Sequence, residues 1–451
     1  MKERLYEIAH SILRLSDADA TEVIVFFVDD LLTRYANSFI TQNSREKAFS
    51  VSVRLRYGNR AGVASTDDIS RESLAALVKN AKEIAMNSPK DPDLPDVPST
   101  KSVEYYPPSY DETLYDPDPE RAARIIRRVI EIGKPFRAFG NVTQGNIHYM
   151  YLTSEGFEGY HRASMAGISI NYMDDTFRQS GWAQRTSYRM KDIEETFEEA
   201  AEISRNKALL NRDPAELKPG RYTVIIESLG IYEILHMMGW FGFSGKSYYE
   251  GTSFLRNKLG QKVFSDKLTI EDRPSDIELF TSPFDFEGTQ KRDIKLVENG
   301  VFKIPALDKR FAKKLNMEST GHAVIPFYPL PFPNHMSIKP GDKSLKEMIE
   351  ETDYGILITR LWYVNVVDPS TFTLTGLTRD GTFLIENGRI SKAIRNMRFT
   401  QNIQEAFNRI VSLENVSHVV TESNYYSFFP SATKVPAIKI EDFTFSSVSK
   451  F

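Results

Sequence analysis

The sequence contains no cysteine, and this absence limits its chemistry. Without cysteine the protein has no disulfide framework, no thiol nucleophile and no thiolate metal ligand, and a reducing cytoplasmic location suits this composition. Basic residues are not in excess, because 57 Lys and Arg face 61 Asp and Glu, for a net charge of -4. Such a balance neither neutralises a nucleic acid nor holds an anionic membrane surface. We predict a cytoplasmic protein without a nucleic-acid partner.

Long apolar runs are also missing from the sequence. The longest runs, such as residues 23–28, have the length of a strand and fall far short of the roughly 20 residues that a membrane helix needs. Residues 1–10 mix charged and apolar side chains and lack the apolar core of a secretory signal. The sequence therefore predicts neither secretion nor a membrane partner.

The length and composition predict two domains. A chain of 451 residues exceeds the usual size of one domain, and 41% hydrophobic residues suffice for substantial cores. Turn-forming residues at 211–214 and 218–220 mark the boundary. We predict an α+β fold, with an N-terminal α/β domain over residues 1–213 and a mostly β domain with short helices over residues 214–451.

Hydrophobic periodicity in the first domain predicts helices and a mixed or antiparallel sheet. Apolar residues three and four positions apart predict helices, and alternating or β-branched stretches predict strands. The predicted helices are 4–15, 71–86, 121–132 and 192–210, and the predicted strands are 21–28, 33–43, 48–57, 61–66, 138–144, 147–153, 159–172 and 179–186. Residues 89–119 hold eight prolines and are predicted to form an extended surface segment rather than a linker between independent domains.

The second domain changes in character, because strands and glycine turns dominate it. Alternating residues over 355–367 and 381–388 predict one or two curved sheets. Short helices are predicted at about 229–241, 308–315 and 402–412.

The seven histidines do not form the usual zinc-peptidase motif. In that motif, His-Glu-x-x-His, two histidines four residues apart share a helix face while the Glu acts on water. His236 is followed by Met237, whose thioether cannot act as a base, and no histidine stands four or five residues later. We interpret His236 as a buried or groove-lining residue on an apolar helix.

Other catalytic arrangements have little support from the residues. His322 and His335 could join His236 in a dispersed three-histidine site, although no spacing requires it. The acidic pairs 271–272 and 285–287 are interpreted as solvated turns. The sequence has neither a Gly-x-Ser-x-Gly elbow nor a Gly-x-Gly-x-x-Gly loop, so it indicates no serine nucleophile and no nucleotide site.

The order of motifs resembles the TldD/PmbA family, metallopeptidase-related proteins also known as modulators of DNA gyrase. No single motif is decisive, but their number and order cover essentially the whole chain. The residues that carry the resemblance are 61–66, 80–85, 220–226, 251–263, 269–272, 284–288, 296–301, 319–322, 339–341, 347–349 and 376–388.

The resemblance implies one of two branches. TldD-type members carry His-Glu-x-x-x-His and a C-terminal cysteine that together bind zinc, whereas PmbA-type members, also called TldE, lack this site and pair with a TldD-type subunit. Here His236 keeps the first position, but Met237 and Phe241 replace the Glu and the second His. The sequence therefore resembles the PmbA (TldE) branch, and the resemblance implies no catalytic residue, no metal ligand and no cofactor in this chain, with zinc only in a TldD-type partner.

We expect a non-catalytic subunit of a cytosolic TldD/PmbA-type protease that acts on unfolded or small peptides. Its partner would be a TldD-type subunit, or a second copy in a homodimer when the chain is alone. Two alternatives stay open: an autonomous metallopeptidase with a non-standard site around His236, and a peptide-binding scaffold without protease activity. The residues expected to line a peptide chamber are His236, Met237, Met238, Phe241 and His322.

Overall fold

A long antiparallel sheet forms the first part of the computed structural model, which describes residues 1–99, 103–421 and 429–449. The six strands run in the order β3-β2-β1-β4-β5-β6. They are β1 (Ala20–Ala36), β2 (Phe39–Tyr57), β3 (Arg60–Thr66), β4 (Arg137–Thr153), β5 (Glu158–Met173) and β6 (Ser180–Ser187). The accompanying helices are α1 (Lys2–Leu15), α2 (Arg71–Asn87), the 3₁₀ turn η1 (Glu112–Leu114), α3 (Pro119–Gly133) and α4 (Met190–Leu210).

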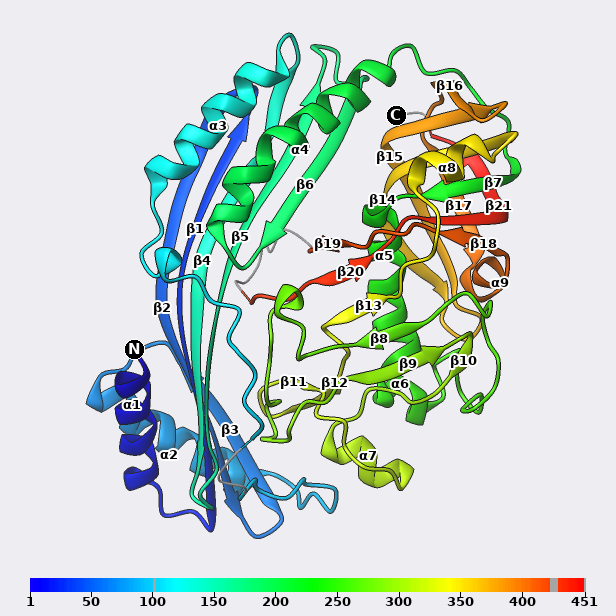
Figure 1. The fold of residues 1–451 in the computed structure, drawn as a ribbon. Helices are drawn as coiled ribbons and strands as arrows, with labels where there is room; N and C mark the ends of the chain where they lie inside the picture. The colour runs from blue at the N-terminus through cyan, green and yellow to red at the C-terminus, as the bar shows by residue number, and fades with distance from the viewer. Residues whose placement is uncertain (100–102, 422–428, 450–451) are drawn as a thin grey trace.

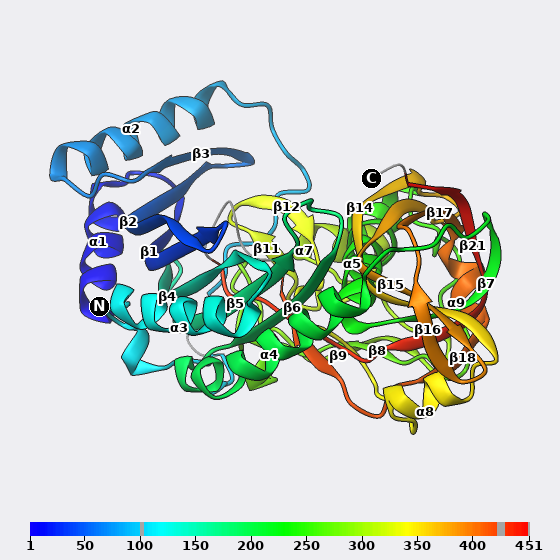
Figure 2. The ribbon, with the colours of Figure 1, turned by 90° about the horizontal axis from the view of Figure 1, so that it is seen from above.

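Helices α1 to α4 cover one face of this sheet, and the second part of the chain covers the other (Figures 1 and 2). Val23 and Val25 point toward α1 and α2 and are fully buried with them. Ile24 points the opposite way and packs with Phe284 and Phe286 of the second part. Because alternate residues of a strand face opposite sides, β1 is buried on both faces along this stretch.

Several strands are longer than the sequence predicted, and the predicted breaks after 28, 43 and 144 were wrong. β1 continues through Asp29, which is buried and accepts two hydrogen bonds from the Arg45 guanidinium, at 2.7 and 2.8 Å. The hairpin turn lies instead at Asn37 and Ser38, where both φ angles are positive. A two-residue turn of this kind suits the twist of a hairpin, and a cross-strand ion pair makes an acidic residue tolerable inside the strand.

The proline-rich segment 89–119 runs along the second part of the chain, with residues 100–102 lying outside the described residues. Tyr106 donates its hydroxyl hydrogen bond to the Lys291 carbonyl at 2.8 Å. Ser109 donates to the Ile277 carbonyl at 2.7 Å and is fully buried. The segment is extended, as predicted, but part of it is packed between the two halves rather than lying at the surface.

The second part contains two main sheets. In the larger one β14, β7, β21, β17 and β15 pair in order, and β14 also pairs with β15, so the pairing closes into a ring. Its strands are β7 (Gly220–Ile226), β14 (Tyr354–Asp368), β15 (Thr373–Glu386), β16 (Arg389–Ala393), β17 (Met397–Asn402), β18 (Ile410–Leu413) and β21 (Ile438–Val448). The second sheet has the order β10-β9-β8-β13-β20-β19, and a separate hairpin lies beside it. These strands are β8 (Ile270–Asp272), β9 (Ile294–Glu298), β10 (Val301–Phe302), β11 (Ala323–Ile325), β12 (Tyr328–Pro331), β13 (Met336–Ile338), β19 (His418–Val420) and β20 (Thr433–Val435).

Short helices connect these strands, and together the two parts confirm the predicted α+β fold. The helix predicted at 308–315 is present as α7, whereas the one predicted at 402–412 ends at Asn408 and continues as strand β18. The predicted domain division at 213 falls between α4 and β7. In the described residues, no helix is long and apolar enough to cross a membrane. The helices are α5 (Ser228–Met238), the π-helical turn η2 (Gly239–Phe243), α6 (Gly245–Glu250), the 3₁₀ turn η3 (Ile277–Leu279), α7 (Lys309–Leu315), α8 (Leu345–Glu350) and α9 (Ile403–Asn408).

Candidate functional site

Helix α5 carries the sequence window that resembles a zinc-peptidase motif. Strand β7, which pairs with β14 and β21, directly precedes this helix in the chain. Ile231, Ile234 and Leu235 are fully buried in the main core. The opposite stripe, Tyr232 and His236, is only partly buried, because residues four apart share a face of the helix. His236 is therefore held at the border of the core.

The imidazole of His236 is fixed in an aromatic cluster. The Trp240 indole N–H donates a hydrogen bond to His236 Nε2 at 3.0 Å, so this nitrogen acts as an acceptor. The rings of Tyr232 and Phe332 lie 5.9 and 5.7 Å from the imidazole, centre to centre. Trp240 in turn lies 4.3 Å from Phe332. A metal ion at Nε2 would have to displace the indole.

The helix widens into a π-helical turn directly after this histidine. The predicted single helix over 229–241 therefore ends at Met238, and η2 follows. Glycine is required in this turn, because a Cβ on Gly239 would lie 2.7 Å from the Phe332 ring and one on Gly242 would lie 2.7 Å from Phe254. Met237 and Phe241 are partly buried and pack against the main core. Neither side chain carries a group that binds zinc or accepts a proton.

The residues present do not fit a zinc ion at this position. Of the three motif positions only His236 keeps a metal-binding side chain, its Nε2 is hydrogen-bonded to Trp240, and the chain has no cysteine. No group of three His, Asp or Glu side chains within residues 1–99, 103–421 and 429–449 is arranged to hold a metal ion.

Two of the residues expected to line a chamber have no exposed surface in this structure. Met238 is fully buried in the main core, and His322 is fully buried beside Asp272. His236, Met237 and Phe241 are partly exposed. The lining of a peptide chamber therefore stays a prediction for these three side chains.

His322 and His335 meet at Asp272 rather than joining the aromatic cluster around His236. His322 Nε2 lies 2.8 Å from Asp272 Oδ2, and the His335 backbone N–H donates to Asp272 Oδ1 at 2.7 Å. The His335 Nε2–H donates to the Phe280 carbonyl at 3.1 Å, and burial lowers the pKa of His335 to about 4. Burial opposes ionisation of Asp272, but its bonds to both histidines outweigh that cost and lower its pKa. Asp272 is fully buried in β8, so its interpretation as a solvated turn was wrong.

The acidic pair Asp285 and Glu287 is also buried, and its interpretation as a solvated turn was wrong. Asp285 Oδ1 accepts the backbone N–H groups of Glu287 and Thr289 at 3.0 and 2.9 Å, which closes a tight loop. Asp308 joins them at the start of α7. Burial, together with the neighbouring carboxylates, raises the pKa of Glu287 to about 8 and that of Asp308 to about 6. These carboxylates form a buried acidic cluster.

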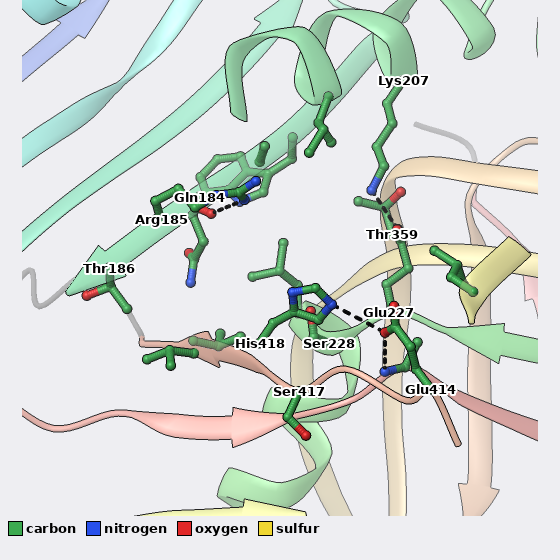
Figure 3. Close-up of a pocket in the computed structure, with 18 of the residues that line it drawn as sticks. Gln184, Arg185, Thr186, Lys207, Glu227, Ser228, Thr359, Glu414, Ser417 and His418 are labelled. Atoms are coloured by element: carbon green, nitrogen blue, oxygen red, sulfur yellow. Dashed lines mark hydrogen bonds and ion pairs between the residues drawn. The ribbon is translucent and has the colours of Figure 1, made fainter. Parts of the chain in front are cut away.

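A cavity of about 520 Å³ lies between the two parts of the chain. Figure 3 shows Lys207 extending from α4 toward Glu227 and Thr359, while β6 and β19 supply other walls. Lys207 Nζ and Glu227 Oε2 form an ion pair of 2.6 Å across the boundary between the two parts. Sequence reasoning missed this cavity, because its lining comes from positions 182 to 437 and no motif connects them.

Two family models match the chain. The PmbA/TldA metallopeptidase C-terminal domain matches residues 219–447, and PmbA/TldA metallopeptidase domain 1 matches residues 22–85. The chain is 26% identical over 422 residues to the metalloprotease PmbA of Escherichia coli O157:H7, covering 87% of this chain and 86% of that protein. It is 27% identical over 396 residues to a metalloprotease TldD homolog of Buchnera aphidicola, covering 80% of this chain and 78% of the homolog.

Solved structures share the whole fold at low sequence identity. TldE from Thermococcus kodakarensis superposes with a TM-score of 0.86 at 20% identity, covering 98% of this chain and 99% of that one. A protein from Bacteroides thetaiotaomicron described as a modulator of DNA gyrase has a TM-score of 0.82 at 21% identity, covering 99% of both chains. Because one family model alone spans more than half of the sequence, the chain belongs to the PmbA/TldD metallopeptidase family, with PmbA-like character.

Proposed function

We propose that this protein is a non-catalytic subunit of a cytoplasmic PmbA/TldD-type protease that acts on unfolded or small peptides. The observation that carries the proposal is the hydrogen bond from Trp240 to His236 Nε2 within the former motif window. Met237 and Phe241 occupy the positions of the base and of the second histidine. A TldD-type partner would supply the zinc, and the chain alone would pair with a second copy.

The side chains of residues 236–241 support a structural or peptide-contacting role rather than cleavage of a peptide bond. Hydrolysis of a peptide needs an activated water and a group that accepts its proton. A thioether at 237 and a phenyl ring at 241 provide neither function. What this helix offers is a partly exposed, mainly aromatic stripe formed by Tyr232, His236 and Trp240, which suits contact with an extended peptide of variable sequence.

Metal content tests the first half of the proposal. Zinc is measured by elemental analysis in protein purified without chelators, both as wild type and as His236→Ala. We expect no stoichiometric zinc in either protein, because His236 Nε2 is hydrogen-bonded to Trp240 and the neighbouring motif positions carry no ligands. One zinc per chain that disappears in His236→Ala would overturn the proposal in favour of an autonomous metallopeptidase.

Reconstitution tests the second half. The chain is mixed with a TldD-type protein from the same source, and complex formation is followed by gel filtration and by cleavage of an unstructured peptide. We expect a complex whose cleavage is lost when the partner's motif Glu is replaced by Gln. If no complex forms and cleavage by the TldD-type protein is unaltered, the subunit role is wrong, and peptide binding by the chain alone would then favour the scaffold alternative.

A further inference from the structure

The cavity between the two parts has a helix N-terminus in its wall. Helix α5 begins at Ser228, and the preceding Glu227 gives no side-chain hydrogen bond to the first turn. The N–H groups of Gly230 and Ile231 both bond to the Glu227 carbonyl, at 2.9 and 3.1 Å. The N–H groups of Ser228 and Leu229, which both line the cavity, lie too early in the helix for an intrahelical partner. This end of α5 therefore presents donors and a positive dipole end.

Two further donor groups of the lining have no partner within the described part of the chain. Thr359 is fully buried, lines the cavity, and its Oγ1 has no hydrogen-bond partner there. The indole N–H of Trp182, on β6, is buried and unpartnered in the same described residues. A buried polar group without a partner is costly, so both groups point to a bound molecule with acceptor atoms.

The carboxylates of the lining are already engaged in ion pairs. Glu227 pairs with Lys207 at 2.6 Å, Glu199 with Arg185 at 3.2 Å, and Glu414 with His418 at 3.3 Å. Three carboxylates nearby disfavour a doubly charged anion such as phosphate, but the donors at α5 still suit a single negative charge.

Most of the remaining wall of the cavity is apolar, and Gln184, Thr186 and Ser417 are its polar members. Ile203 of α4, Leu229 of α5 and Val419 of β19 contribute to it. A volume of about 520 Å³ lies within the range of sites for small organic ligands. A ligand that matches this lining carries one carboxylate next to an apolar side chain.

We propose that this cavity binds the α-carboxylate of a short peptide ending in an apolar residue, or of the corresponding amino acid. The carboxylate lies at the N-terminus of α5, accepts hydrogen bonds from the backbone of Ser228 and Leu229 and from Thr359, and interacts with Lys207. The choice of a peptide rests on the proposed function. The site itself is separate from the aromatic cluster around His236.

Calorimetric titration of the isolated chain tests this site. The probes are N-acetyl-Ala-Leu with a free carboxylate, the same dipeptide as C-terminal amide, free leucine and inorganic phosphate. We expect the free acid to bind with a Kd of about 1 mM or tighter, and the amide to bind at least about tenfold more weakly, because hydrogen bonds to a charged group are stronger. Thr359→Val keeps the shape of the side chain and should weaken the free acid about tenfold or more.

Two variants serve as controls for Thr359→Val. Thr359→Ser keeps the hydroxyl and should bind the free acid as wild type does, which separates the hydrogen bond from a folding defect. Thr400→Val makes the same change at an exposed position of β17 and should leave binding unchanged.

Each outcome decides the proposal. Binding of leucine as tight as that of the dipeptide supports the carboxylate site and identifies amino acids as its source. Equal affinity for acid and amide, tighter binding of phosphate, or no binding of either the free acid or leucine overturns it. Because no TldD-type partner is present in the titration, failure to form the protease complex would defeat the proposed function and leave this result unaffected.

Discussion

Replacing Glu22 by glutamine should destabilise the protein strongly, because its carboxylate neutralises two buried arginines in the first sheet. Glu22 has no exposed surface and accepts hydrogen bonds from Arg54 at 2.6 Å, from Arg56 at 2.7 Å and from the Tyr151 hydroxyl at 2.8 Å. The guanidinium of Arg54 is buried as well. Glutamine keeps the size of the side chain but leaves both guanidinium groups without a counter-charge.

The expected loss is about 3–5 kcal/mol, the usual cost of removing one partner from a buried ion pair. Burial is the largest effect and opposes ionisation of Glu22, but the charges of Arg54 and Arg56 and the hydrogen bonds from Arg54 and Tyr151 together outweigh it and lower the pKa of Glu22. A lowered pKa means that the contribution is complete above the ordinary glutamate range and is lost as the pH falls through the lowered value. The difference between wild type and Glu22→Gln should therefore be constant near neutrality and shrink only in acid.

Urea unfolding at pH 7, followed by circular dichroism and fluorescence, measures the difference. The matched control is Glu198→Gln, since Glu198 accepts a 2.8 Å hydrogen bond from Arg128 but both side chains are about half exposed. The control should cost less than about 1 kcal/mol, because water already screens an exposed pair. If the two variants lose the same stability, the buried network contributes no more than a surface pair and the reasoning is refuted.

Three further perturbations follow from the structure. Burial and then Asp285 raise the pKa of Glu287 to about 8, so the free energy of unfolding should fall as the pH rises toward that value. Glu287→Gln should reduce the difference between the free energies of unfolding at pH 5 and pH 8 by up to a few kcal/mol, as measured by urea titration. An unchanged difference between the two pH values contradicts this prediction. Gly181→Ala would place a Cβ 2.1 Å from a backbone oxygen of α4 and should lower the stability measured by thermal unfolding by about 1–3 kcal/mol. The control Gly220→Ala, whose Cβ would lie 3.4 Å from its nearest neighbour, should lower the stability less. Equal losses of stability would show that α4 moves away from the new Cβ at no cost. Ser344 caps α8 in a capping box, so Ser344→Ala should cost about 1 kcal/mol in urea unfolding, and no loss would mean that the cap is replaceable.

Local patterns predicted most helices and the location of most strands, because both depend on neighbouring residues. The helix around 309–315 and the four helices of the first part appear where spacing and capping residues placed them. The predicted end of the first strand before Asp29 was wrong, because an acidic residue at this position suggests a loop when only the sequence is considered. Only the opposite strand supplies Arg45, and that partner makes the buried carboxylate stable.

The candidate site shows the same division. The sequence alone shows Met at 237, Phe at 241 and no cysteine. No structure is needed to recognise that these side chains offer no ligand for zinc. The bond between Trp240 and His236 could have been suspected from their spacing of four residues on one helix. The burial of Asp272 and Glu287 could not, because pairs of acidic residues in turns are usually solvated.

The sequence by itself determined the family, the fold class, and the absence of cysteine and of a Glu after His236, because each depends on which residues are present and in what order. The tertiary structure alone decided which polar groups meet. It brought His322 and His335 to Asp272, and it built a cavity from α4 and from the start of α5. These groupings arise from the packing of segments far apart in the chain. Only after that packing does it become visible that Thr359 Oγ1 has no hydrogen-bond partner among the residues that the structure describes.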